Sequence, residues 1–138
     1  MQYQVISALR TTIAVLMLVS AVAAIHSSAG GLGGSWEGKV TQDNPPETYP
    51  MEMNLYGNVG NINYPSLGCG GNLEFIRTDG KVYWYREHIT FGKDKCIDGG
   101  TIQMRRHALG DDTYWDWRWG GGGASARGVV RGSGVKES

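Results

Sequence analysis

The chain of 138 residues carries 13 Lys and Arg against 13 Asp and Glu, so its formal net charge is zero, and it contains 22 Gly and only two Cys. A single domain is expected at this length, and without a basic block the sequence offers no electrostatic contact for nucleic acid. A hydrophobic fraction of 41% with five Trp also excludes the composition of a disordered chain.

Residues 1–29 have the features of a signal peptide followed by a short linker. Arg10 is their single charged residue, and a largely apolar stretch of 14 residues, Thr12 to Ile25, follows it. A membrane-spanning helix needs about 20 such residues, and Ala21-Val22-Ala23 has the small-x-small pattern of a signal-peptidase site. We therefore expect a secreted or periplasmic domain with no membrane span after cleavage behind Ala23 or Ala29. An uncleaved N-terminal anchor is the alternative.

From residue 30 onward the apolar residues recur with a period of two, and clusters of Gly, Asn, Asp or Pro interrupt the pattern. This is typical of antiparallel strands joined by turns. The dipeptide Asp79-Gly80 is a strong hairpin signal, because both residues tolerate a positive φ. No segment shows a helical period. Eight strands are predicted, over residues 35–42, 49–56, 59–64, 72–77, 81–90, 101–107, 113–119 and 124–131.

Eight alternating strands in about 100 residues are enough to close a small barrel whose interior is filled, or nearly filled, by side chains. Closure would also remove the exposed edge strands that promote aggregation. The predicted fold is therefore all-β: a single-domain antiparallel meander of about eight strands, forming a closed or nearly closed barrel over residues 30–131. A β-sandwich is the alternative. Residues 132–138 are expected to form a disordered tail.

The two cysteines, Cys69 and Cys96, are predicted to form a disulfide, because an exported chain meets an oxidising compartment. Two other roles are open. With His88 and His107 they could ligate zinc, although neither pair has the short spacing of structural zinc sites. Cys69 could also be a nucleophile with His88 as its base. With the disulfide formed, no metal and no other cofactor is expected.

A resemblance to a known family rests on four strings: GSWEG (34–38), YPSLGCGG (64–71), EHITFGKDKC (87–96) and DGGT (98–101). They resemble a small bacterial extracytoplasmic domain of uncharacterised function. That domain occurs behind signal peptides and as the outer C-terminal module of some actinobacterial serine/threonine protein kinases. The resemblance covers residues 35–131. It implies a location outside the cytoplasm and a shared architecture, and it assigns no catalytic residue.

The segment 114–119 alternates Trp with charged residues, which places Trp115, Trp117 and Trp119 on one face of a strand, about 7 Å apart. Such a row of indoles could form part of the core. It could also be a platform that stacks on sugar rings. We expect a split, with Trp117 in the core and Trp119 at the surface beside a barrel mouth.

The strand predicted over 81–90 places Tyr83, Tyr85, Glu87 and Ile89 on one face. If this face points inward, Glu87 is a buried carboxylate that needs hydrogen bonds or a cation such as Arg105. A carboxylate among phenols inside a barrel could anchor a ligand, and a structural ion pair is the alternative. The candidate ligand-binding residues are Tyr64, Tyr83, Tyr85, Glu87, Trp115 and Trp119.

The segment Phe91–Lys95 precedes Cys96, so the disulfide would brace it as a rigid loop. Its side chains Phe91, Lys93, Asp94 and Lys95 are candidate contacts for a protein partner. No hydrolase, metalloprotease or phosphate-binding motif is present, and no enzyme activity is expected. We expect an exported, non-catalytic module that binds a small cell-envelope or extracellular ligand, such as a glycan or peptidoglycan fragment. The alternative is an inhibitor or immunity protein that binds a secreted hydrolase through this loop.

Overall fold

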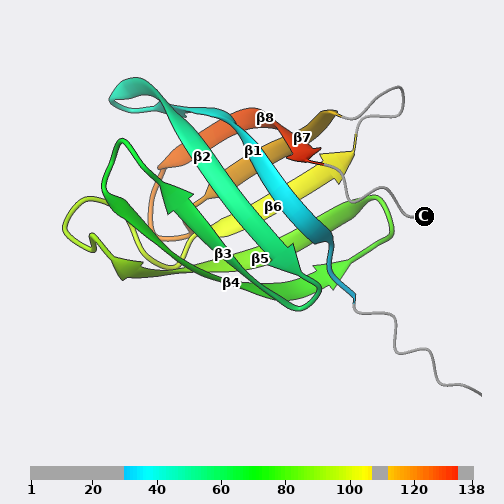
Figure 1. Ribbon diagram of the computed structural model, residues 1–138. Helices are drawn as coiled ribbons and strands as arrows, with labels where there is room; N and C mark the ends of the chain where they lie inside the picture. Colours follow the sequence, from blue (N-terminus) through cyan, green and yellow to red (C-terminus); the bar gives the residue numbers. More distant parts are fainter. Residues whose placement is uncertain (1–29, 107–111, 134–138) are drawn as a thin grey trace, which may run out of the picture.

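Eight antiparallel strands form a closed barrel in the computed structural model, which describes residues 30–106 and 112–133 (Figure 1). Each strand pairs with the next one in the chain, and β8 pairs back with β1. This confirms the all-β meander and the closed barrel, and the sandwich alternative is wrong. The strands are β1 (Gly33–Asp43), β2 (Pro46–Tyr56), β3 (Val59–Tyr64), β4 (Cys69–Thr78), β5 (Val82–Phe91), β6 (Thr101–Arg106), β7 (Asp112–Arg118) and β8 (Ser125–Ser133).

Several strands extend beyond their predicted ends. β2 begins at Pro46, a first strand position where the missing N–H is tolerated. β4 begins at Cys69, within a predicted loop, and β8 ends at Ser133, inside the predicted tail. The predicted signal peptide (1–29), His107 and residues 134–138 lie outside the described residues. In the part of the chain that the structure describes, no helix is long and apolar enough to cross a membrane.

The barrel interior is filled by alternate residues of every strand, as the period of two predicts. In β2, for example, Met51, Met53 and Leu55 point inward, and in β6 so do Ile102 and Met104. These side chains belong to one continuous hydrophobic cluster. The core therefore runs through the barrel, and a ligand site in the interior has to lie at one of its ends.

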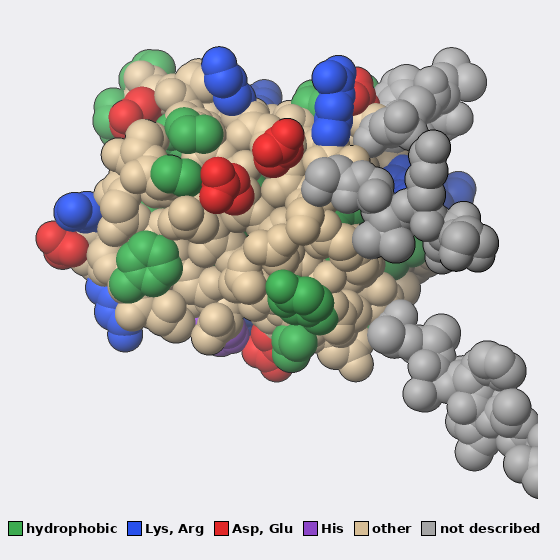
Figure 2. All heavy atoms as spheres, viewed as in Figure 1, with side chains coloured by type: hydrophobic (Ala, Val, Ile, Leu, Met, Phe, Trp, Pro, Cys, Tyr) green, Lys and Arg blue, Asp and Glu red, His purple; other side chains and the backbone are tan. Residues whose placement is uncertain are grey.

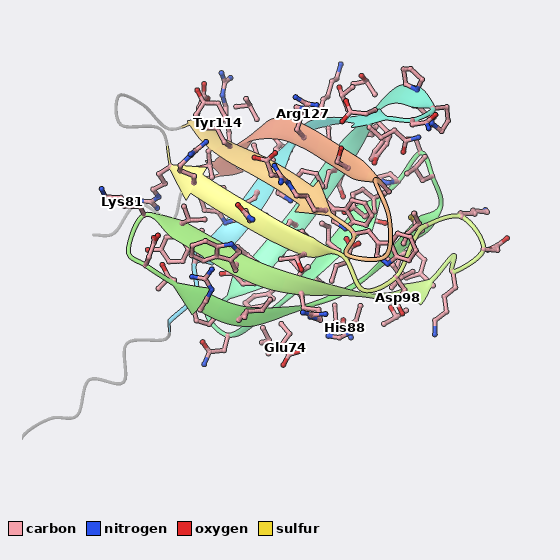
Figure 3. The ribbon with its side chains drawn as sticks, turned by 180° about the vertical axis from the view of Figure 1, so that it is seen from behind. Glu74, Lys81, His88, Asp98, Tyr114 and Arg127 are labelled. Atoms are coloured by element: carbon pink, nitrogen blue, oxygen red, sulfur yellow. A yellow bond between two sulfur atoms is a disulfide. The ribbon has the colours of Figure 1, made fainter. Side chains whose placement is uncertain are left out.

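The two ends of the barrel differ. Lys81 lies at one end and Asp98 at the other (Figure 3). At the Lys81 end the hydroxyl of Tyr85 accepts a hydrogen bond from the backbone N–H of Leu32 over 2.6 Å. The Tyr85 ring also packs edge-on against Phe75, with centroids 5.5 Å apart. The Asp98 end carries the β1–β2, β3–β4, β5–β6 and β7–β8 connections.

A disulfide between Cys69 and Cys96 ties the start of β4 to the long β5–β6 connection. Both sulfurs are committed to this bridge, so the zinc and nucleophile alternatives for the cysteines are wrong. Gly92 makes the approach possible: its φ is 64°, and a Cβ there would collide with the Gly68 carbonyl and with Cys69. The Gly92 carbonyl then accepts hydrogen bonds from the backbone N–H groups of Lys95 and Cys96, at 2.9 and 3.2 Å.

On the face shown in Figure 2, hydrophobic side chains form only small, separate patches. Ion pairs join neighbouring strands on the outer surface of the barrel, including Asp43 with Arg127 at 2.9 Å. Such exposed pairs contribute little to stability. The outer wall in this view therefore offers no broad apolar face, and the end of the barrel is the place to look for a site.

Candidate functional site: a pocket at one end of the barrel

The Asp98 end of the barrel contains a pocket with a volume of about 250 Å³. Eight-stranded barrels are wide enough to hold one small ligand, and this volume lies near the lower limit of about 300 Å³ for ligand pockets. Four connections between strands supply the rim, with Asn44, Pro45, Leu67, Lys95, Ile97 and Ala124. The floor is formed by inward-facing side chains of four strands, Tyr49, Tyr64, Glu87, Trp115 and Trp117.

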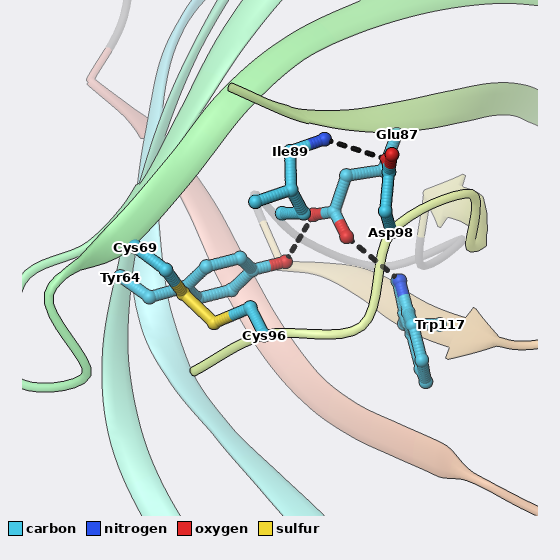
Figure 4. Close-up of a disulfide and its surroundings, with 7 residues drawn as sticks. All are labelled: Tyr64, Cys69, Glu87, Ile89, Cys96, Asp98 and Trp117. Atoms are coloured by element: carbon cyan, nitrogen blue, oxygen red, sulfur yellow. Dashed lines mark hydrogen bonds between the residues drawn. A yellow bond between two sulfur atoms is a disulfide. The ribbon is translucent and has the colours of Figure 1, made fainter. Parts of the chain in front are cut away.

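Glu87 is the carboxylate on the floor of this pocket, and it is only 2% exposed. The Tyr64 hydroxyl donates a hydrogen bond to its Oε2 over 2.6 Å. The Trp117 indole Nε1 donates another to its Oε1 over 3.0 Å (Figure 4). Both donors are neutral and come from other strands, β3 and β7. Glu87 therefore sits at the point where three parts of the barrel wall meet in the interior.

Burial raises the pKa of Glu87 from its ordinary value of 4.5 to about 7, and the negative charge of Asp98 adds to the rise. The hydrogen bonds from Tyr64 and Trp117, and the nearby His88, act in the opposite direction. Burial and the charge of Glu87 also raise the pKa of Tyr49 to about 12 and that of Tyr64 well above its ordinary value. The two phenols are therefore neutral wherever Glu87 titrates.

Residues 98–100 form a short segment, here called the strap, that hydrogen-bonds to the backbone of β5 at Glu87 and Ile89. The Asp98 carboxylate accepts a hydrogen bond from the Ile89 backbone N–H over 2.8 Å (Figure 4). The Glu87 N–H donates to the Gly100 carbonyl over 2.8 Å, and the Gly99 N–H donates to the Glu87 carbonyl over 3.2 Å. The indole of Trp117 packs directly on Gly100, where a Cβ would collide with it. Strap and indole together fix the position of the carboxylate.

The predicted ligand-binding residues do not all come together. Tyr64, Glu87 and Trp115 line the pocket, whereas Tyr83 and Tyr85 do not. Each residue adds about 3.3 Å along a strand, so positions two and four residues before Glu87 lie progressively nearer the opposite end of the barrel. Tyr85 is instead used there to bind the Leu32 backbone.

The three indoles of segment 114–119 do not share one environment, because two are buried and one is exposed. Trp115 and Trp117 are 1% and 8% exposed, whereas Trp119 is 39% exposed. This confirms the predicted split between Trp117 and Trp119, but a continuous exposed platform of three indoles is wrong. The reason is that β7 ends at Arg118, so Trp119 leaves the strand and packs over Gly121 of the following turn. There it lines a second, more polar pocket on the outer wall, together with Asp116, Arg118 and Arg127.

Arg105 is not the partner of Glu87, which corrects one of the two predicted ways to satisfy this carboxylate. Met104 points into the core, so the alternation of β6 turns Arg105 outward, where it is exposed. Its guanidinium lies 5.7 Å from the centre of the Tyr114 ring. The carboxylate is satisfied by neutral donors and not by an ion pair.

Two residues of the pocket floor, Tyr49 and Trp117, were absent from the predicted ligand-binding residues. Tyr49 is in phase with Met51 and Met53, so alternation alone could have placed it inside the barrel. Nothing local in the sequence signals the bond from Trp117 to Glu87, because it joins residues 30 positions apart.

The predicted partner loop lies on the rim of the same pocket. Phe91, at the end of β5, is 49% exposed, and Lys93 and Asp94 are exposed as well. Lys95 lines the pocket, and so does the exposed Ile97 just after the bridge. The loop therefore offers apolar side chains on both sides of a charged tip.

Comparison of the chain with protein-family models and with curated proteins finds no match. Within the described ranges, no group of three or more His, Cys, Asp and Glu side chains is placed to hold a metal ion. The function is therefore proposed from the geometry of the pocket.

The raised pKa of Glu87 predicts an unusual pH dependence of stability. The folded protein retains a proton that the unfolded chain loses near pH 4.5, so the free energy of unfolding should fall as the pH rises towards about 7 and then level off. A shift of this size corresponds to a loss of about 3 kcal/mol. Urea unfolding across this range, compared with Glu87→Gln, isolates the effect because the variant lacks the titrating group. Equal pH profiles for the two proteins would contradict it.

Proposed function

We propose that this protein is an exported module that binds a small cell-envelope or extracellular ligand in the pocket at the Asp98 end of the barrel. The observation that carries the proposal is a carboxylate held in place on the floor of an aromatic pocket. Ligand sites combine mostly apolar walls with a few well-placed polar groups. Here Tyr49, Tyr64, Trp115 and Trp117 supply the walls and Glu87 the polar group.

Export is supported by two independent properties of the chain. Its first 29 residues have the pattern of a signal peptide. Cys69 and Cys96 are joined, and disulfides persist mainly in oxidising compartments outside the cytoplasm. The envelope or the surrounding medium is therefore where we expect the ligand to be found.

Binding rather than catalysis is supported by the partners of Glu87. Its two oxygens accept hydrogen bonds from the Tyr64 phenol, whose pKa burial raises well above its ordinary value, and from the Trp117 indole, which is only a donor. Neither partner is therefore an activated nucleophile. The sulfur of Cys96, which also lines the pocket, is held in the disulfide. Fixed donors of this kind orient a carboxylate for recognition.

Filling the mouth of the pocket should weaken ligand binding. Ala124 lies half-buried on the rim, so Ala124→Trp should place an indole in the mouth and reduce affinity at least about tenfold. Val129→Trp is a matched control, because Val129 is exposed on the outer wall and does not line the pocket. Calorimetric titration with chitotetraose and with purified muropeptides tests both variants against the unchanged protein.

Exposed Phe91 and Ile97, beside the loop braced by the disulfide, favour the inhibitor alternative. Titration of the same variants with a hydrolase separates it from the proposed pocket function. An inhibitor should form a stoichiometric complex with a secreted hydrolase such as lysozyme. That complex should be lost in Phe91→Ala and retained in Ala124→Trp. If such a complex forms and the unchanged protein binds no small molecule, the proposed pocket function is wrong.

A further inference from the structure

The pocket contains a carboxyl group that becomes negatively charged when it ionises, and no cation of the described chain forms an ion pair with it. The Glu87 carboxylate is almost fully buried, and its hydrogen-bond donors, Tyr64 and Trp117, are both neutral. The ion pairs found within residues 30–106 and 112–133 join other groups, all of them on the outer surface. Burying a carboxylate without a counter-charge is costly. A positive charge supplied by a ligand would remove this cost.

No charged group around Glu87 forms an ion pair with it. On its own strand His88 points outward, where its Nε2 lies 3.0 Å from Glu74 (Figure 3). The neighbouring strand β4 presents Leu73 opposite Glu87. Asp98, in the strap, adds a second negative charge close to Glu87. Lys95 lines the rim of the pocket and forms no ion pair with Glu87.

The walls of the pocket are suited to a positive charge. The rings of Tyr49 and Tyr64 lie nearly at right angles, with an interplanar angle of 84° and centroids 5.8 Å apart. The indoles of Trp115 and Trp117 line the same space. The faces of aromatic rings carry negative potential and attract cations, and rings that meet at an angle are how proteins enclose quaternary ammonium groups.

We infer that the ligand of this pocket is a small organic cation, whose ammonium group lies between the aromatic walls with Glu87 as its counter-charge. The inference rests on the proposed function and names the chemical class of its ligand. A neutral sugar would leave the ionised carboxylate without a counter-charge, and an anion would be repelled by it. The volume of about 250 Å³ admits a compact ammonium compound.

A pair of probes that differ in charge alone tests this inference. Choline carries a quaternary ammonium, and 3,3-dimethyl-1-butanol has a neutral carbon atom in its place. Calorimetric titration of the disulfide-bonded protein should show choline binding at least about tenfold more tightly than the neutral isostere. Because the pKa of Glu87 is about 7, choline affinity should rise with pH from about 6 to 8, as the carboxylate ionises. Equal affinities for the two probes would overturn the inference.

Variants test whether Glu87 is the group that recognises the positive charge of choline. Glu87→Gln should weaken choline binding at least about tenfold and remove its pH dependence, whereas Lys81→Met, at the opposite end of the barrel, should do neither (Figure 3). Circular dichroism and melting verify that each variant is folded. If Glu87→Gln does not fold, the comparison of the two probes on the unchanged protein still decides. Unchanged choline binding in a folded Glu87→Gln variant would overturn the inference.

Failure of the inference can be told apart from failure of the proposed function. If chitotetraose or a muropeptide binds, is blocked by Ala124→Trp, and choline does not bind, the inference is wrong and the pocket remains a ligand site. If choline and its isostere bind equally, the pocket recognises shape and not charge, with the same consequence. If none of these probes binds, both are overturned.

Discussion

Replacing Trp115 with Ala should lower the free energy of unfolding by about 3 to 5 kcal/mol. The indole is 1% exposed and is one of the largest fully buried side chains of the barrel. It lies opposite Met104 on β6 and Gly128 on β8, so its removal opens a cavity that spans the interior between three strands. Urea unfolding followed by circular dichroism measures the loss, with the slope of the transition confirming that the two states compared are the same.

Two further substitutions control this result. Trp119→Ala removes an equal volume from an exposed position and should change stability by no more than about 1 kcal/mol. Trp115→Phe should cost less than Trp115→Ala. The buried Nε1 of Trp115 has no hydrogen-bond partner among the described residues, so Phe keeps much of the packing and removes an unsatisfied donor. Equal losses for Trp115→Ala and Trp119→Ala would show that the indole row is not divided into core and surface.

Removing the disulfide should cost about 3 to 4 kcal/mol, since the bridge closes a loop of about 28 residues in the unfolded chain. Cys69 and Cys96 are 27 positions apart, and the loop between them contains the whole β4–β5 hairpin. The double variant Cys69→Ala/Cys96→Ala measures this loss in urea unfolding. Its Trp fluorescence should also change, because the Asp98–Gly100 strap, on which the Trp117 indole packs, begins two residues after Cys96 and would lose the anchor that the disulfide provides.

Reduction of the unchanged protein with dithiothreitol is the control for the double variant. Both should unfold at the same urea concentration if the missing bridge, and not the alanine side chains, causes the loss. A stability loss below about 1 kcal/mol in both would mean that the loop is already constrained in the unfolded state. Two free thiols in the denatured, unreduced protein would contradict the bridge itself.

Most of the barrel could be predicted from the sequence because its information is local. Alternation placed Met51, Met53, Ile102 and Met104 inside, and the Asp79-Gly80 turn marks the β4–β5 hairpin. The ends of strands were less predictable. Gly70 and Gly71 suggested a loop, yet both are buried in β4, where the absence of a side chain lets the neighbouring strands approach closely. Pairing with β3 and β5 places Gly70 and Gly71 in a strand, and a local sequence pattern contains no information about such pairing.

The site was predictable only in part, for the same reason. Alternation placed Glu87 on one face with Tyr85 and Ile89, and Glu87 is buried because that face points inward. Its partners depend on which strands lie across the interior. Tyr64 and Trp117 are 23 and 30 positions away, and no spacing rule selects them over Arg105. Trp119 was placed correctly at the surface, since four consecutive glycines, residues 120–123, follow it and mark the end of the strand.

The pairing of β1 with β8 also determines the order in which this protein can fold. Seven of the eight strand pairs join chain neighbours, whereas Thr41 pairs with Arg127, 127 − 41 = 86 positions later. Closing so long a loop has the largest entropic cost of any pair in the barrel, and contacts of this range slow folding. We therefore expect a curved open sheet to form first, with the β1–β8 seam joining last. Until that step the floor of the pocket, which takes residues from β2, β3, β5 and β7, is enclosed on one side only.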